Sequence, residues 1–440
     1  MEHLLRGYSV NQPTWFYLSL LLSLSVFFRF NRFWSLRNLD LALLLSASPG
    51  LLLLEVQKDE GPNPIATLGY IWLFVVSGLF LLRLLADVGL QRRPQFGQNM
   101  NAPGMAFLCV SAFLFITVQG ITKRLPDSTE STVKKADALL KGSTLVPNIG
   151  EDSIAGPVPP LIAAPVGLIF EQLAAPMLAI LAHGAVIGGL WLAGRRLFGD
   201  SQLGWAMATL YLMLPCTAIH VGEFNHVLPS ALLVWAVVYH QRPTIAGVLM
   251  GLACGTLFFP LFLLPLWLAF YGRKGALRFG GALGLVAIAL LGSIALTSSD
   301  PHSFIRKTIG TIDYAVLAFQ EGNASSGFWS ENLSPYRLPI IVAYFVMLVS
   351  LTIWPRKKTL EHLLAHSAAL IVGTQFWYTQ QAGTYLLWYL PLLLMVVFRP
   401  RLAHLRSPSE MEADKAADLV GLSRPTGRAL TPLEHSHMLR

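Results

Sequence analysis

The chain has 440 residues, of which 54% are apolar and only 13% are charged. An average soluble domain is about 25% charged, so this composition, with a mean hydropathy of +0.55, excludes an ordinary soluble enzyme. The formal net charge of +8 is explained by the Lys and Arg that membrane proteins collect in their inner loops, so we expect no nucleic-acid partner. The sequence predicts an all-α, polytopic integral membrane protein.

Thirteen apolar runs are candidate membrane spans, since a span takes about 20 residues. Several runs are shorter than that, so the predicted number is 11–13. The segment from Thr244 to Tyr271 is either two crossing helices broken at Pro260 or one helix with a re-entrant turn. The runs lie at about 14–30, 39–54, 66–86, 104–121, 173–194, 202–220, 227–240, 244–257, 259–272, 278–297, 337–354, 362–379 and 385–398.

Basic residues gather in alternate loops, which the positive-inside rule makes cytoplasmic. This pattern places the N-terminus outside and the C-terminus inside. The two longest connections, 122–172 and 298–336, then share the outer face, and long connections of this kind are often functional. The basic loops include Arg29 to Arg37, Arg92 and Arg93, Arg195 and Arg196, Arg242, Arg273 to Arg278, Arg356 to Lys358 and Arg399 to Arg406.

The first outer segment contains two carboxylates suited to proton transfer. Asp127 lies about five residues beyond the fourth apolar run, at the membrane–water interface, where a carboxylate can accept the proton of a hydroxyl. Glu130 would face the same side of a helical turn. Lys123 and Arg124 are candidates for binding phosphate. The alternative is an ordinary polar loop with scattered charges.

Two further segments of this outer region have helical patterns. Residues 133–140 place apolar side chains on one face, as in a short amphipathic helix lying in the interface. Residues 156–170 form a second apolar stretch that begins with Gly and Pro. We expect both segments to be interfacial helices.

The turn at 220–226 carries His220, Glu223, Asn225 and His226 on the same outer face. We expect these side chains to hydrogen-bond a sugar or a phosphate, although polar groups are also normal at helix ends. Their spacing is not a known zinc pattern, so we expect no metal.

The second long outer segment mixes aromatic and polar residues, which suits either a carbohydrate or an aromatic belt at the interface. Its candidates for binding phosphate are Arg306, Lys307 and Arg337. The sequence contains no GxxxxGK[ST], GxGxxG or GxSxG motif, which argues against a nucleotide-binding enzyme.

Several short motifs follow one another along the chain. They are Asp127 with Leu139 to Gly142, Gly156 to Leu161, Gly194 to Gly199, Gly222 to Asn225, Ala246 to Pro265 and Tyr385 to Leu394. In this order they resemble the motifs of GT-C membrane glycosyltransferases, and the chain is most similar to their bacterial polyprenyl-phosphate-mannose-dependent branch, of the glycosyltransferase family 87 type. It departs from that pattern at Leu257, where a basic residue is common, and at Ser128, where an aromatic usually follows the Asp.

The resemblance implies a division of the chain and a location. Residues 1–100 would be an N-terminal addition of three spans, 101–400 a GT-C-like catalytic core, and 401–440 a disordered cytoplasmic tail. The membrane would be the bacterial inner membrane, with the active site facing outside.

The resemblance also implies a reaction. A polyprenyl-phosphate donor would give mannose, or another hexose or pentose, to a hydroxyl of a lipid, glycan or protein. Asp127, or else Glu130, would be the general base of an inverting displacement, and Arg306, Lys307 and Arg337 would support the leaving phosphate. No cofactor is required, and nothing demands a divalent metal. The alternatives are a transporter or flippase, which the scarcity of mid-span charges disfavours, and an inactive relative with a structural role.

Overall fold

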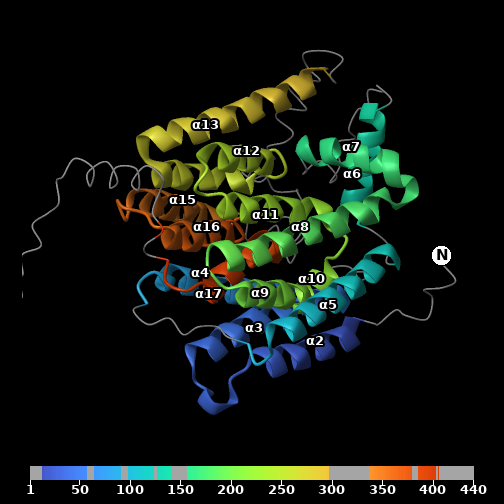
Figure 1. Cartoon of the computed structure of the whole chain (residues 1–440), viewed down its shortest axis with the longest axis vertical. Helices are drawn as coiled ribbons and strands as arrows, with labels where there is room; N and C mark the ends of the chain where they lie inside the picture. Colours follow the sequence, from blue (N-terminus) through green and yellow to red (C-terminus); the bar gives the residue numbers. More distant parts are fainter. Residues whose placement is uncertain are drawn as a thin grey trace, which may run out of the picture.

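The computed structural model describes residues 12–56, 64–90, 98–122, 126–140, 156–296, 336–378, 385–402 and 405. In these residues the regular structure is helical, and the longer helices lie roughly side by side in stacked layers (Figure 1). Two of the helices, α6 and α7, gather at one end of the stack. The elements are α2 (Gln12–Phe27), η1 (Phe30–Arg32), α3 (Leu36–Val56), α4 (Pro64–Asp87), α5 (Ala102–Thr122), α6 (Asp127–Leu140), α7 (Val158–Phe170), η3 (Glu171–Leu173), α8 (Ala174–Arg196), α9 (Ser201–Met213), α10 (Pro215–Ile219), α11 (Phe224–Val238), α12 (Pro243–Cys254), η4 (Phe259–Leu263), α13 (Leu264–Leu296), α15 (Arg337–Ile353), α16 (Leu360–Thr374) and α17 (Leu386–Phe398).

The lengths of the helices support an integral membrane protein. Five described segments are long and apolar enough to cross a bilayer by themselves. Six shorter apolar helices of 10–17 residues accompany them. The all-helical membrane class is therefore confirmed, while the number of spans stays a prediction. The five long segments are Leu36–Glu55, Ile65–Asp87, Ala102–Thr122, Ala174–Arg196 and Phe259–Ala295.

The segment around Pro260 forms helices on both sides of a break. Helix α12 ends at Cys254, Pro260 lies in η4, and α13 follows directly. Inside α13, Gly272 has φ 62° and ψ −177°, so the chain changes direction there. A φ in this range is unfavourable for residues with a Cβ. The second part of α13 then returns along α12, where Gly247 lies so close to Phe279 that a Cβ would come within 2.3 Å of its carbonyl oxygen.

The three N-terminal helices share one core with the rest of the chain. Helix α4 packs against α16, and α2 packs against α9. Ring contacts join the two parts, between Phe80 and Tyr389 with centroids 5.8 Å apart and between Phe27 and Phe398 at 6.0 Å. Helices α2 to α4 therefore pack against the remainder of the chain, and the division into an N-terminal addition and a core stays a prediction.

Ion pairs reinforce this packing at the end of the bundle away from α6. Arg83 on α4 lies 2.6 Å from Asp40 and 2.9 Å from Asp87. Arg399, at the end of α17, lies 2.5 Å from Asp87 and 2.5 Å from Glu361. Asp87 and Arg399 are almost fully buried, so this network connects α3 and α4 to α16 and α17 through charges with little access to water.

Candidate active site

Helix α6 begins at the first of the two predicted carboxylates. The carbonyl of Pro126 accepts the backbone N–H groups of Thr129 and Glu130 at 3.0 and 3.2 Å. Asp127 and Glu130 occupy the first turn, where negative side chains interact favourably with the helix N-terminus. The helix predicted for 133–140 is confirmed and begins six residues earlier, at Asp127.

Hydroxyl side chains tie α6 to the turn at 220–226. Ser128 Oγ donates to Glu223 Oε2 at 3.2 Å, and Thr129 Oγ1 donates to the carbonyl of Gly222 at 2.7 Å. Thr132 Oγ1 lies 3.0 Å from Nδ2 of Asn225. The two segments that the sequence singled out separately are therefore joined by hydrogen bonds.

Asn225 is the centre of this junction. Its side chain is buried, and Nδ2 also donates to the carbonyl of Ser128 at 3.0 Å. Since a buried polar group costs free energy when its hydrogen bonds are not made, this amide holds α6 at a defined distance from α11. The hydroxyl groups of Ser128, Thr129 and Thr132 were not among the predicted site residues. Their one signal in the sequence is a spacing that places all three on one face of a helix.

The two carboxylates of α6 face away from this junction. At 3.6 residues per turn, Asp127 and Glu130 project from the opposite side of the helix to Ser128, Thr129 and Thr132. Asp127 is exposed and Glu130 is half-buried. The junction with the 220–226 turn therefore uses neither carboxylate.

An aromatic cluster lies directly beside the turn. Trp388 Nε1 donates to Nδ1 of His226 at 2.9 Å, and the planes of the two rings are nearly parallel, at 9°. Phe259 stacks on Trp388 with centroids 4.6 Å apart. His226 is buried in this arrangement and accepts with Nδ1, so the structure gives it a packing contact, and its predicted role in binding substrate stays a prediction.

Arg337 lies at the far side of the same cluster. It is the first residue of α15, it is buried, and its Nε donates to the carbonyl of Trp377 at 3.1 Å. Trp377 contacts Phe258 with centroids 6.0 Å apart, and Phe258 contacts Trp388 at 6.0 Å. A hydrogen bond to the backbone of Trp377, followed by ring contacts from Trp377 through Phe258 to Trp388, therefore connects Arg337 to the residue that binds His226.

Helix α7 is attached to the break after α12. The N–H of Gly156 donates to the carbonyl of Thr256 at 2.8 Å, and that of Val158 donates to Gly255 at 3.1 Å. A Cβ on Gly156 would lie 2.2 Å from the carbonyl oxygen of Gly255, so only glycine fits this approach. The motifs at 156–161 and 246–265, far apart in the sequence, meet here, and α6 packs on α7.

Several predicted site residues are not part of this geometry. Lys123, Arg124, Arg306 and Lys307 lie outside the described residues. His220 is on the 220–226 turn and is half-buried, with its backbone N–H donating to the carbonyl of Cys216 at 3.1 Å. Among the residues that the structure describes, no group of three or more His, Cys, Asp or Glu side chains is placed to hold a metal ion.

The long apolar helices define a helical membrane protein. The family model of glycosyltransferase family 87 matches residues 156–404, more than half of the chain. The chain therefore belongs to glycosyltransferase family 87 and is an enzyme that transfers a sugar from a donor to an acceptor. No curated protein and no solved structure matches it at a significant level.

The matched range divides the candidate site. It includes α7 to α17, with the 220–226 turn, the aromatic cluster and Arg337. It does not include α6, so Asp127 and Glu130 lie before it. The helix that carries these carboxylates is connected to the matched part of the chain by the hydrogen bonds from Ser128, Thr129 and Thr132 and by its packing on α7.

Proposed function

We propose that this protein transfers a sugar, mannose or another hexose or pentose, from a polyprenyl phosphate to an acceptor hydroxyl. The acceptor belongs to a lipid, a glycan or a protein at the outer face of a bacterial inner membrane. The observation that carries this proposal is the junction between α6 and the 220–226 turn. It joins the helix that carries Asp127 and Glu130 to the part of the chain that the family model matches, and neither carboxylate takes part in its hydrogen bonds.

Asp127 is the proposed general base. It removes the proton of the acceptor hydroxyl while the hydroxyl oxygen bonds to the anomeric carbon, and the bond from that carbon to the phosphate oxygen breaks. A single displacement of this kind inverts the anomeric carbon. Asp127 suits this role because it is the exposed carboxylate of the first turn of α6. Glu130, which is half-buried in the same turn, is the alternative base.

The leaving polyprenyl phosphate carries negative charge and requires cationic support. Arg337 is the described candidate for this role, and Arg306, Lys307, Lys123 and Arg124 are further candidates from the sequence. The polar side chains of the turn, His220, Glu223 and Asn225, are the proposed contacts of the sugar. A lipid donor agrees with the apolar helices around this end, since such a donor reaches the site from the bilayer.

A donor panel tests the function. The purified, detergent-solubilised protein is incubated with polyprenyl-phosphate sugars and, in parallel, with nucleotide sugars, and transfer is followed with radiolabelled sugar. We expect transfer only from the lipid donors. Transfer only from nucleotide sugars would contradict the proposed lipid-linked donor. No transfer from any donor would favour the interpretation that the protein is an inactive relative.

The same assay tests the base. Asp127→Asn should lower kcat by about 10²–10⁴-fold, the usual contribution of general base catalysis. Asp137→Asn is the matched control, because Asp137 is also an exposed carboxylate of α6 but lies outside its first turn, and it should retain activity. Full activity of Asp127→Asn, with Glu130→Gln inactive, would move the base to Glu130.

A further inference from the structure

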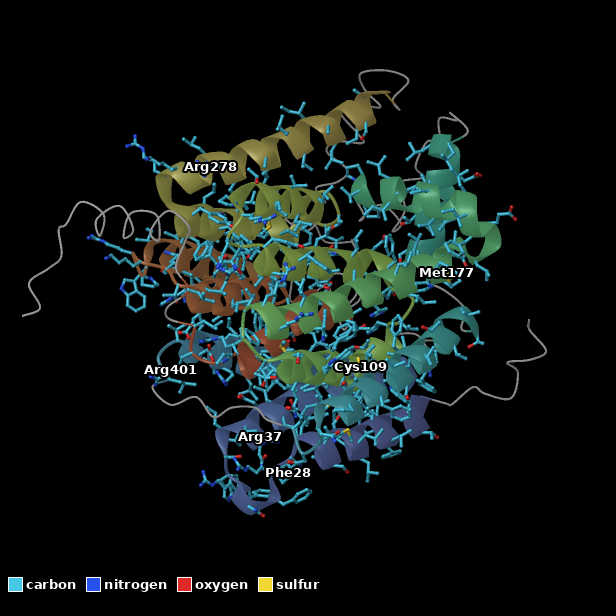
Figure 2. All side chains as sticks on the ribbon, in the orientation of Figure 1. Phe28, Arg37, Cys109, Met177, Arg278 and Arg401 are labelled. Carbon is cyan, nitrogen blue, oxygen red and sulfur yellow. The ribbon has the colours of Figure 1, made fainter. Side chains whose placement is uncertain are left out.

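A pocket opens at the end of the bundle opposite α6 and α7, between the C-terminal ends of α8 and α11. Its volume is about 330 Å³, and it is lined by Arg196, Leu197, Val238, Tyr239, Gln241 and Arg242. Figure 2 shows Met177, near the start of α8, at the end that holds α6 and α7, and shows Arg278 and Arg401 at the other end. The pocket is therefore at the basic end of the molecule and is separate from the candidate active site.

The lining of the pocket is positively charged. Arg196 and Arg242 are both exposed, and the residues around them include an amide and a phenol but no carboxylate. The nearby Asp200 is used elsewhere, since it caps α9 by accepting the N–H groups of Gln202 and Leu203 at 2.7 and 3.4 Å. Two arginines therefore line one cavity whose wall contains no carboxylate.

Aromatic packing fixes one of these guanidinium groups. The guanidinium carbon of Arg196 lies 5.9 Å from the centre of the Tyr239 ring, a distance at which a cation is attracted to the ring. Tyr239 stacks on Trp235 with an interplanar angle of 18°, and Trp235 Nε1 donates to the carbonyl of Ala185 on α8 at 2.9 Å. The cation is thus positioned by a rigid contact between α8 and α11.

The backbone of the second arginine is fixed at the start of the next helix. Arg242 is the N-cap of α12, and its backbone N–H donates to the carbonyl of Tyr239 at 2.8 Å. The N-terminus of α12 adds partial positive charge at the same edge of the pocket. The two arginines therefore lie on different elements, and the cavity is between them.

Arginine pairs of this kind recognise phosphate oxygens, which they bind in a bidentate manner. The rest of the wall, Leu197 and Val238, is apolar and belongs to the ends of two helices with apolar sequences. Basic pockets between helices at the membrane boundary suit anionic head groups. We propose that this pocket binds the phosphate of an anionic phospholipid. This site is independent of the sugar-transfer reaction.

Native mass spectrometry of the full-length protein in detergent tests the proposal. The protein is titrated with phosphatidylglycerol and, separately, with phosphatidylcholine. We expect one tightly bound phosphatidylglycerol, and about a tenfold loss of its affinity in the double variant Arg196→Gln/Arg242→Gln, because two charge-assisted contacts are removed. The matched control is Arg273→Gln/Arg278→Gln, which removes two exposed arginines of α13 at the same end and should bind like the wild type.

A further variant tests the cavity without changing the charge. Leu197→Trp fills the pocket and keeps both arginines, so it should also lose the bound lipid. Thermal unfolding without added lipid shows that each variant is folded. Wild-type affinity in the double variant or in Leu197→Trp would overturn the proposal, as would an equal loss in the control. If millimolar inorganic phosphate displaces the lipid, the proposal that the ligand is a phospholipid is wrong and the pocket is a site for free phosphate.

Discussion

At the scale of single residues, the hydrogen bond between Thr132 and Asn225 helps to fix the position of α6. The Thr132 hydroxyl is buried against the Asn225 amide, so Thr132→Val should leave that amide with one partner fewer and lower the free energy of unfolding by about 1–2 kcal/mol. The rate of sugar transfer should fall as well, because α6 carries the proposed base.

Ser131→Ala is the control for this prediction. The Ser131 hydroxyl is half-buried and bonds only within its own helix in the contacts described, to the carbonyl of Ser128 at 2.9 Å. Chemical denaturation and the transfer assay should show little change in this variant. Equal effects of Thr132→Val and Ser131→Ala would mean that the junction does not position α6.

Some residues of the candidate site could be predicted from the sequence, but the hydrogen bonds that join α6 to the 220–226 turn could not. Asp127, Glu223 and Asn225 were predicted from residue type and position relative to the apolar runs. The junction between α6 and the turn was not predicted. Thr129 and Gly222, which bond there, are 93 positions apart in the sequence, and only the folded chain brings them together. Ser128 counted as a departure from the family pattern, and the structure gives it a contact with Glu223.

At the scale of elements, α7 depends on one glycine. Gly156→Ala would place a Cβ 2.2 Å from a backbone oxygen of Gly255, so α7 has to move away from the end of α12. We expect a loss of several degrees in Tm and a large loss of transfer activity. Both are measured on the purified protein in detergent.

Gly167→Ala is the matched control on the same helix. A Cβ there meets nothing within 4 Å, and Ala is a better helix former than Gly by about 1 kcal/mol. This variant should therefore be as stable as the wild type or slightly more stable. A Tm for Gly156→Ala that equals that of Gly167→Ala would contradict the close approach.

The buried ion pairs connect α4 to α16 and α17. Arg399→Met removes the partner that Asp87 and Glu361 share, and breaking a buried pair in this way typically costs about 3–5 kcal/mol. Arg401→Met, which changes an exposed arginine close by, should have little effect. If thermal unfolding is the same in both variants, the ion pairs do not hold the N-terminal helices to the core.

The sequence predicts a helix well where the length of an apolar run is enough to set its ends. The bilayer requires about 20 apolar residues in a span, and α4, α5 and α8 follow the predicted runs closely. The start of α6 was missed by six residues, since its first turn is polar and is stabilised by the cap at Pro126 and by contacts with the 220–226 turn. The kink at Gly272 likewise depends on the return of α13 along α12.

At the scale of the whole molecule, the two ends differ in chemistry. One end holds α6 and α7 (Figure 1), and the labelled arginines Arg278 and Arg401 lie at the other (Figure 2). The positive-inside rule predicts that the end with the arginines is cytoplasmic. The proposed active site then faces outside.

Cysteine labelling in intact cells tests this orientation. The native cysteines are buried or half-buried. Most of the maleimide labelling should therefore come from a cysteine that is introduced at an exposed position. A membrane-impermeant maleimide should label Asp137→Cys in intact cells and Arg278→Cys only after permeabilisation. The reverse pattern would contradict the orientation.

The stereochemistry of the product tests the central claim most directly. A polyprenyl-phosphate sugar of defined anomeric configuration is given to the purified protein with an acceptor, and the anomeric proton of the product is assigned by NMR. A single displacement with Asp127 as base predicts a product of inverted configuration, and none above background from Asp127→Asn. A product of retained configuration, or an Asp127→Asn variant that is fully active, would contradict the proposed reaction at this site.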